Sequence, residues 1–170
     1  MCEFANGACK GKTMGLFDKD TDEPTTFTKP VDPNWVRTPQ GTFLPFLTID
    51  PEALGLSGVG GIFLIWHGGL KPQWVYAGHS ADLAASFHQV GEMSEVVEYD
   101  INGGLWVGWA PVKKPYRAGA VKYIDENFNT LVPNESAYND KTDPVPVIAP
   151  VTKRKKSSGL AALNPFAKSD

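Results

Sequence analysis

Two short apolar runs carry the side chains of this sequence that could take part in chemistry. Gly61-Ile62-Phe63 opens the first run, Tyr76-Ala77-Gly78 closes the second, and His79 follows directly. A catalytic hairpin would present such a tyrosine to a phosphodiester, and His79 or the more distant His88 could touch a phosphate. The alternative is a hairpin that keeps the shape without the chemistry, because a lone tyrosine on an apolar strand is more often part of a core.

Two strands and a helix would position these side chains. The apolar runs at 61–67 and 73–78 are joined by the turn-forming sequence HGGLKP, which predicts an antiparallel pair. Ser80 or Asp82 can then cap a helix that ends at Gly91. The candidate residues therefore lie on the hairpin and at the entry to this helix.

Further strands and a second helix are expected downstream. Residues 96–101 are strand-like, residues 105–112 alternate with period two, and Asn102-Gly103-Gly104 between them is typical of a hairpin turn. Residues 115–128 place apolar side chains on one helical face, where Gly119 would allow close packing on the sheet. This order predicts a small α+β domain with a largely antiparallel sheet flanked by helices.

Proline content separates a central domain from two arms. Residues 1–40 are polar and turn-rich, and residues 137–170 are proline-rich and then basic, so both are expected to be extended. Residues 41–136 hold the predicted strands and helices, beginning with a short helix that Asp50-Pro51 would start. We therefore expect one α+β domain with N- and C-terminal arms.

Composition and charge argue against several function classes. The chain has 170 residues, a net charge of −3 and a pI of about 5.6, which gives no general attraction to nucleic acid or to an anionic membrane. No apolar run approaches the ~18 residues that span a bilayer, and a secretory signal is not expected. Cys2 and Cys9 do not make a four-ligand zinc site. We expect a cytoplasmic protein, or part of a particle assembled inside the cell, with no cofactor, metal or membrane partner.

With these elements in place, the sequence resembles the GIY-YIG nuclease family. Gly61-Ile62-Phe63 stands where the family has its first Gly-Ile-Tyr, and Tyr76-Ala77-Gly78 stands where it has Tyr-Ile-Gly. The resemblance covers roughly residues 58–136, including the strand-to-helix entry after Tyr76 and the segment Leu131-Val132-Pro133-Asn134. It implies a site in which two tyrosines surround a water, an arginine on the first helix contacts phosphate, and a glutamate on a later helix binds Mg²⁺.

Three of the four groups that the resemblance implies are missing at the matching positions. Phe63 has no hydroxyl, and Ser86, ten residues after Tyr76, cannot make the two-pronged phosphate contact of an arginine. The glutamate position falls at Ala120 or Val121, neither of which can ligate a hard cation. A nuclease mechanism of the family's kind is therefore not expected.

Neighbouring polar residues are weak substitutes. Asp125 and Glu126 lie more than a helical turn beyond the glutamate position and on a different face. The remnant-site candidates are therefore Tyr76, His79 and Phe63. Mg²⁺ is expected only if the chain is a divergent nuclease.

The charge of the predicted domain also argues against DNA binding. Residues 58–136 contain five Lys and Arg and eight Asp and Glu. Affinity for DNA comes from basic groups that displace counterions, so this balance is unfavourable. A solvated helix entrance explains the one basic cluster, which comprises Lys113, Lys114 and Arg117.

The C-terminal arm holds the one dense basic run, followed by an apolar patch. The basic residues are Lys153, Arg154, Lys155 and Lys156, and the apolar ones are Leu160, Leu163 and Phe166. This order predicts a docking peptide that approaches phosphates or an acidic protein surface and then buries its apolar side chains, although a solubilising tail would have the same composition.

We expect a non-catalytic GIY-YIG-like structural or interaction module. It would hold protein partners through its arms, within a larger assembly such as a virion. A divergent metal-dependent endonuclease and a protein that binds nucleic acid through its basic tail are the alternatives.

Overall fold

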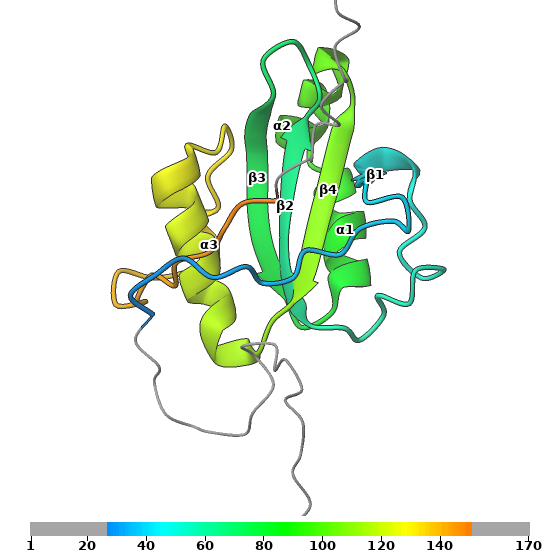
Figure 1. The fold of residues 1–170 in the computed structure, drawn as a ribbon. Helices are drawn as coiled ribbons and strands as arrows, with labels where there is room; N and C mark the ends of the chain where they lie inside the picture. The colour runs from blue at the N-terminus through cyan, green and yellow to red at the C-terminus, as the bar shows by residue number, and fades with distance from the viewer. Residues whose placement is uncertain (1–26, 151–170) are drawn as a thin grey trace, which may run out of the picture.

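The computed structural model describes residues 27–150 of the chain. These residues form a four-stranded antiparallel sheet with helices on both faces, so the expected α+β fold is confirmed (Figure 1). The strand order is β1-β4-β2-β3, with β1 (Leu44–Pro45), β2 (Gly61–His67), β3 (Gln73–Ser80) and β4 (Leu105–Pro111). None of the described helices is both long and apolar enough to cross a membrane. The predicted docking residues between Lys153 and Phe166 lie outside the described part of the chain.

β2 is a central strand, and its sequence explains that place. All seven residues of GIFLIWH are buried, because β3 and β4 pair with the two edges of β2 and helices cover both faces of the sheet. The predicted antiparallel hairpin of β2 and β3 is confirmed. The predicted cap is also confirmed, since the Asp82 Oδ1 accepts a hydrogen bond from the Ala85 amide at 3.2 Å and begins α1 (Leu83–Gly91).

The strand expected at residues 96–101 is wrong. These residues lie in α2 (Ser94–Val97) and in the 3-10 helix η2 (Glu98–Asn102). The carbonyl of Asp100 accepts a hydrogen bond from the Gly104 amide at 2.8 Å, and its side chain accepts one from the Leu105 amide at 3.0 Å. The predicted hairpin turn is therefore a helix end, at which Gly103 has a φ of 98°.

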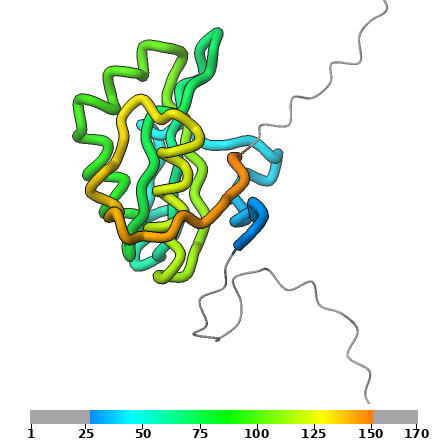
Figure 2. Tube along the Cα trace, turned by 90° about the vertical axis from the view of Figure 1, so that its left-hand side faces the viewer, coloured from blue at the N-terminus to red at the C-terminus, as the bar shows by residue number. Residues whose placement is uncertain are grey.

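The helices lie in separate layers on the two faces of the sheet (Figure 2). Helices α1 and α2 pack on one face, and the side chains of Phe63 and Ile65 from β2 point toward them. Helix α3 (Lys114–Phe128) packs on the other face against Ile62 and Leu64. Alternate residues of β2 thus supply two separate cores, as the period of a strand requires.

Residues that precede and follow 41–136 in the sequence also pack in the core. Val31 pairs with Val147 in a parallel bridge, and the Trp35 indole donates a hydrogen bond to the Ile148 carbonyl at 2.7 Å. Trp35 and Val147 are both buried in the core on the α3 face. The proline-rich residues 137–150, which we expected to be part of an extended arm, therefore pack on the domain.

Gly119 allows residues 137–150, which we call the strap, to approach α3. The Val145 amide donates a hydrogen bond to the Gly119 carbonyl at 2.9 Å, and a Cβ at position 119 would clash with the Asp143 carbonyl oxygen. Lys122 of the same helix donates to the Thr142 carbonyl at 3.0 Å. We had expected Gly119 to pack closely on the sheet. Its close neighbour is instead the segment around Asp143.

Candidate functional site

Phe63 and Tyr76, two of the three remnant-site candidates, lie together on the α1 face of the sheet. Their ring centroids are 6.1 Å apart, and the Phe63 ring meets Phe87 of α1 edge to face at 5.3 Å. Phe63 is 2% exposed and Tyr76 is 8% exposed. The structure therefore brings the two hairpin aromatics together inside a core.

Further aromatic rings close this part of the core. Phe87 also contacts Phe46 at 5.7 Å and Trp109 at 6.0 Å, in both cases edge to face. Such contacts stabilise a buried cluster beyond the burial of its area. Hydrolysis needs a place for water beside the reacting groups, and around Phe63 that place is filled by rings.

His79, the third candidate, has a structural partner of its own. It lies three residues after Tyr76 on β3, so the two side chains leave the strand on opposite faces. Its Nε2 is 2.7 Å from the carbonyl oxygen of Ala137, at the end of the 3-10 helix η3 (Glu135–Ala137). His79 thus ties the chain after α3 to β3.

The positions that match the family's arginine and glutamate are also placed. Ser86 is partly buried on α1, a helix that contains no Lys or Arg. Ala120 and Val121 are buried on the α3 face, opposite to Tyr76. Among residues 27–150, no three His, Cys, Asp or Glu side chains form a group that could hold a metal ion.

Arg117 is held by the backbone and is not a free basic group. Its Nε donates a hydrogen bond to the Val112 carbonyl at 2.6 Å, and its guanidinium lies directly against Gly60. Burial lowers the pKa of Arg117 from its usual range. Its role in the fold is to join the start of α3 to the chain that enters β2.

Asp125 stands more than a helical turn beyond the family's glutamate position, but its carboxylate still lies near Tyr76. Its carboxylate accepts hydrogen bonds from the Thr130 hydroxyl at 2.8 Å, from the Asn134 amide at 3.1 Å and from the Tyr138 hydroxyl. Burial raises the pKa of Asp125, and these three donors lower it by less. Burial and then the charge of Asp125 raise the pKa of Tyr76, so the carboxylate lies within electrostatic range of the tyrosine.

The residues around Asp125 cover the outer edge of the sheet. The amides of Leu131 and Val132 donate to the carbonyls of Trp74 and Val75 at 3.0 and 2.8 Å. The Asn134 side chain donates to the Ala77 carbonyl at 3.1 Å. Asp125 therefore holds a loop that pairs with β3, a task that helical spacing alone could not reveal.

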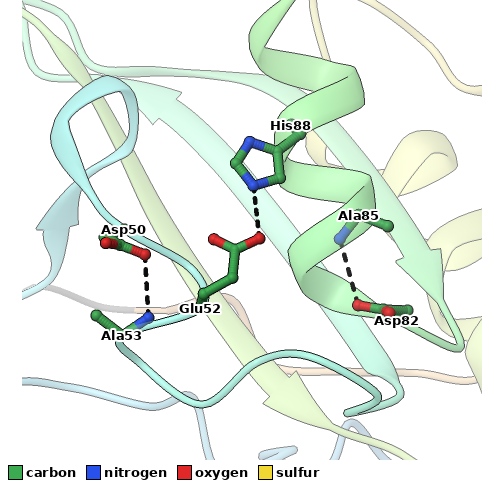
Figure 3. A network of polar contacts seen from close by, with 6 residues as sticks. All are labelled: Asp50, Glu52, Ala53, Asp82, Ala85 and His88. Carbon is green, nitrogen blue, oxygen red and sulfur yellow. Dashed lines mark hydrogen bonds and ion pairs between the residues drawn. The ribbon is translucent and has the colours of Figure 1, made fainter.

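A groove lies between residues 46–51 and α1, and we call it the α1 groove. Its volume is about 250 Å³, and Phe46, Ile49, Pro51, Phe87, His88 and Glu92 are among its lining residues. Beside it, Glu52 Oε1 lies 2.8 Å from His88 Nε2 in a solvent-exposed pair (Figure 3). The Asp50 carboxylate accepts from the Ala53 amide at 3.0 Å, but hydrogen-bonded turns follow it instead of the predicted helix.

The part of the chain that carries the α1 groove is strongly acidic. Residues 41–112 contain seven Asp and Glu but only one basic residue, Lys71. Residues 151–170 have the opposite balance, with five Lys and Arg and one Asp. The modest overall charge thus conceals two segments of opposite sign.

Comparison of the chain with known protein families, with curated proteins and with solved structures found no match.

Proposed function

We propose that this chain is a non-catalytic module with a GIY-YIG-like fold, which acts through protein contacts within a larger assembly. The burial of Phe63 is the observation that carries the non-catalytic part. Its ring is packed against Phe87 and Tyr76, where a catalytic hairpin would need a hydroxyl and a water. The order of hairpin, helix, strand and helix supports the likeness in fold.

A divergent metal-dependent endonuclease is the second candidate, and Asp125 is the observation that favours it. Its carboxylate is close enough to affect the pKa of Tyr76. Its oxygens, however, already accept hydrogen bonds from Thr130, Asn134 and Tyr138. A cation would have to displace these donors and the loop that covers β3, so the arrangement favours a structural role.

The separation of charge supports the interaction part of the proposal. Residues 41–112 are acidic, whereas the basic run Lys153–Lys156 is followed by apolar residues. Opposite charges on different parts of a chain favour protein association and its specificity. An assembly formed inside the cell, such as a virion, is the setting that we propose.

A cleavage assay tests the non-catalytic part. The full chain is incubated with single-stranded, duplex and branched DNA in the presence of Mg²⁺ or Mn²⁺, beside the Tyr76→Phe variant. We expect no metal-dependent products from either protein. Cleavage by the wild type that disappears in Tyr76→Phe would overturn the proposal in favour of the endonuclease.

Limited proteolysis tests the interaction part. The isolated full chain and the same chain within its native assembly are digested under identical conditions. We expect cleavage within residues 1–26 or 151–170 of the isolated chain and protection of these sites in the assembly. Equal cleavage in both samples would contradict a role of the terminal segments in assembly.

A further inference from the structure

Two large aliphatic side chains are almost fully exposed at one end of the sheet. Leu70 has a relative exposure of 106% and Ile101 one of 89%, whereas no other large hydrophobic residue among residues 27–150 exceeds 44%. Leu70 lies in the turn between β2 and β3, and Ile101 lies in η2, at the same end of the sheet (Figure 1). We call these two residues and their loops, residues 68–72 and 98–104, the apolar tip. Single exposed apolar residues are common on protein surfaces, but two on neighbouring loops form a contact surface.

The two loops of the apolar tip are packed directly against each other. A Cβ at Gly69 would be 2.5 Å from the Asn102 carbonyl oxygen, so a glycine is needed for this approach of the two backbones. Leu70 and Ile101 are each one residue away from the contact, and their side chains therefore start from adjacent parts of the backbone. A surface that is already assembled costs less free energy to bind than one that must be ordered first.

The charges beside the apolar tip favour a basic ligand. Glu95, Glu98 and Asp100 are exposed on α2 and η2, and Lys71 is the only Lys or Arg in residues 68–72 and 94–104. Three acids and one base give these two loops a net charge of −2. The same acids disfavour a contact between the tips of two copies, because like charges would meet there.

One segment of this chain matches the apolar tip in both charge and hydrophobicity. Residues 153–166 read KRKKSSGLAALNPF, with four basic residues, no acidic residue and the apolar residues Leu160, Leu163 and Phe166. Residues 1–26 contain three Lys but five Asp and Glu, so they do not complement an acidic surface. Opposite charges direct the encounter of two surfaces, and apolar anchors supply most of the affinity.

The described chain ends within reach of its own apolar tip. The Trp35 indole holds the Ile148 carbonyl, and the amide that follows Trp35 donates to the Trp109 carbonyl of β4. Trp109 is four residues from the end of β4 at the tip, which is about 14 Å along a strand. Leu160 follows Ile148 by 12 residues, and a chain of this length spans up to about 40 Å.

A link of this length favours docking on the same copy. It keeps the segment near the tip at an effective concentration of the order of mM. Segments of other copies compete only at the concentration of the dissolved protein, which is far lower in dilute solution.

We infer that residues 153–166 dock on the apolar tip of their own chain. Leu160, Leu163 and Phe166 cover Leu70 and Ile101, and the basic run faces the acids of α2 and η2. This inference goes beyond the proposed function, because it concerns the chain before it meets a partner. A partner that takes up the C-terminal segment would uncover the tip as a second contact surface.

Nuclear Overhauser contacts in the full chain test the inference. We expect contacts between the ring protons of Phe166 and the methyl groups of Leu70 or Ile101, and none with the methyl groups of Leu54, which is also exposed but lies before β2. In an equal mixture of ¹³C-labelled and unlabelled chains, the contacts should occur only within one chain. Contacts between labelled and unlabelled chains would overturn the assignment to the same copy, and the lack of any contact between the segment and the tip would overturn the inference.

A matched pair of double variants tests docking through a second measurement. Leu70→Ser/Ile101→Ser should speed chymotrypsin cleavage after Phe166 at least about threefold, because cleavage follows the free fraction of the segment. The control Leu47→Ser/Leu54→Ser changes two leucines that are 43% and 42% exposed outside the tip and should leave the rate unchanged. All four side chains are exposed, so both variants should fold. Faster cleavage in the control alone would place the segment near residues 47–54 and overturn the inference.

The failure of this inference and that of the proposed function give different results. Protection of residues 151–170 in the native assembly, with no contact between Phe166 and the tip in the free chain, would overturn the inference but keep the proposed function. Metal-dependent cleavage of DNA that depends on Tyr76 would overturn the proposed function, whereas the contacts of Phe166 with Leu70 or Ile101 would still support docking.

Discussion

The ring of Phe63 lies over the backbone of Gly78 on the neighbouring strand. The two residues are partners in the antiparallel pairing of β2 and β3, and a Cβ at position 78 would be 2.5 Å from the Phe63 Cζ. The glycine thus provides room for the ring, and the ring covers a position that has no side chain of its own. Packing alone therefore explains why this hairpin pairs glycine with an aromatic residue.

Replacement of Gly78 by alanine should destabilise the protein. The new methyl group would press on a ring that is 2% exposed, so we expect the free energy of unfolding to fall by about 1–3 kcal/mol in urea titrations. Gly91→Ala is the control, because an added Cβ at Gly91 meets no atom within 4 Å. Equal stability of Gly78→Ala and the wild type would show that the ring can move aside.

Phe63→Tyr would restore the residue that the GIY-YIG nucleases have at this position. The added hydroxyl would enter a core of aromatic rings, and we expect a loss of about 1–3 kcal/mol in stability from a buried polar group without a partner. We also expect no metal-dependent cleavage of DNA. Cleavage by this variant would instead show that one hydroxyl is the only group the site lacks.

The parts of the fold that local sequence patterns determine could be predicted. The run GIFLIWH requires burial on both faces, and Asp82 precedes α1 as a capping residue, so the hairpin and the helix followed from the residues alone. Residues 96–101 could not be assigned in this way. Their apolar spacing fits a strand or a short helix, and the positive φ of Gly103 is compatible with a hairpin turn or a helix end.

Long-range contacts were the features that the sequence did not reveal. Trp35 and Val147 lie in proline-rich segments at opposite ends of the described chain, and only the tertiary structure brings both to one core. Asp125 meets Thr130 and Asn134 because the chain turns back after α3, which helical spacing does not describe. The predicted hairpin accounts for the proximity of Phe63 and Tyr76, whereas the position of the Asp125 carboxylate near Tyr76 depends on the tertiary structure.

Asp125 should make stability depend on pH in a defined direction. Its pKa is raised in the folded state by burial, so its contribution to stability is fully present below the ordinary pKa of about 4 and is lost as the pH rises through the folded value. In Asp125→Asn this part of the pH dependence should disappear. Urea unfolding of both proteins from pH 3.5 to pH 7 measures it, and parallel curves would contradict the assignment.

Gly119→Ala should release the strap from α3. The added Cβ would clash with the Asp143 carbonyl, which is backbone and cannot rotate away, so the clash should outweigh the ~1 kcal/mol gain in helix propensity. We expect faster trypsin cleavage after Lys141, an exposed residue of the strap. Ala118→Ser, at the adjacent and partly buried position, serves as the control, and equal cleavage rates for both variants would contradict the role of Gly119.

The covered edges of the sheet limit how copies of this chain can join. Residues 131–134 pair with the outer side of β3, while β1 is two residues long, ends on a proline and flanks β4, whose Trp109 carbonyl is also taken by the Val36 amide. Within residues 27–150, neither side offers a long free row of amides and carbonyls to an incoming strand. Polymers that grow by adding strands to this sheet, as in amyloid, are therefore disfavoured, and copies that join through residues 27–150 would do so through side-chain surfaces.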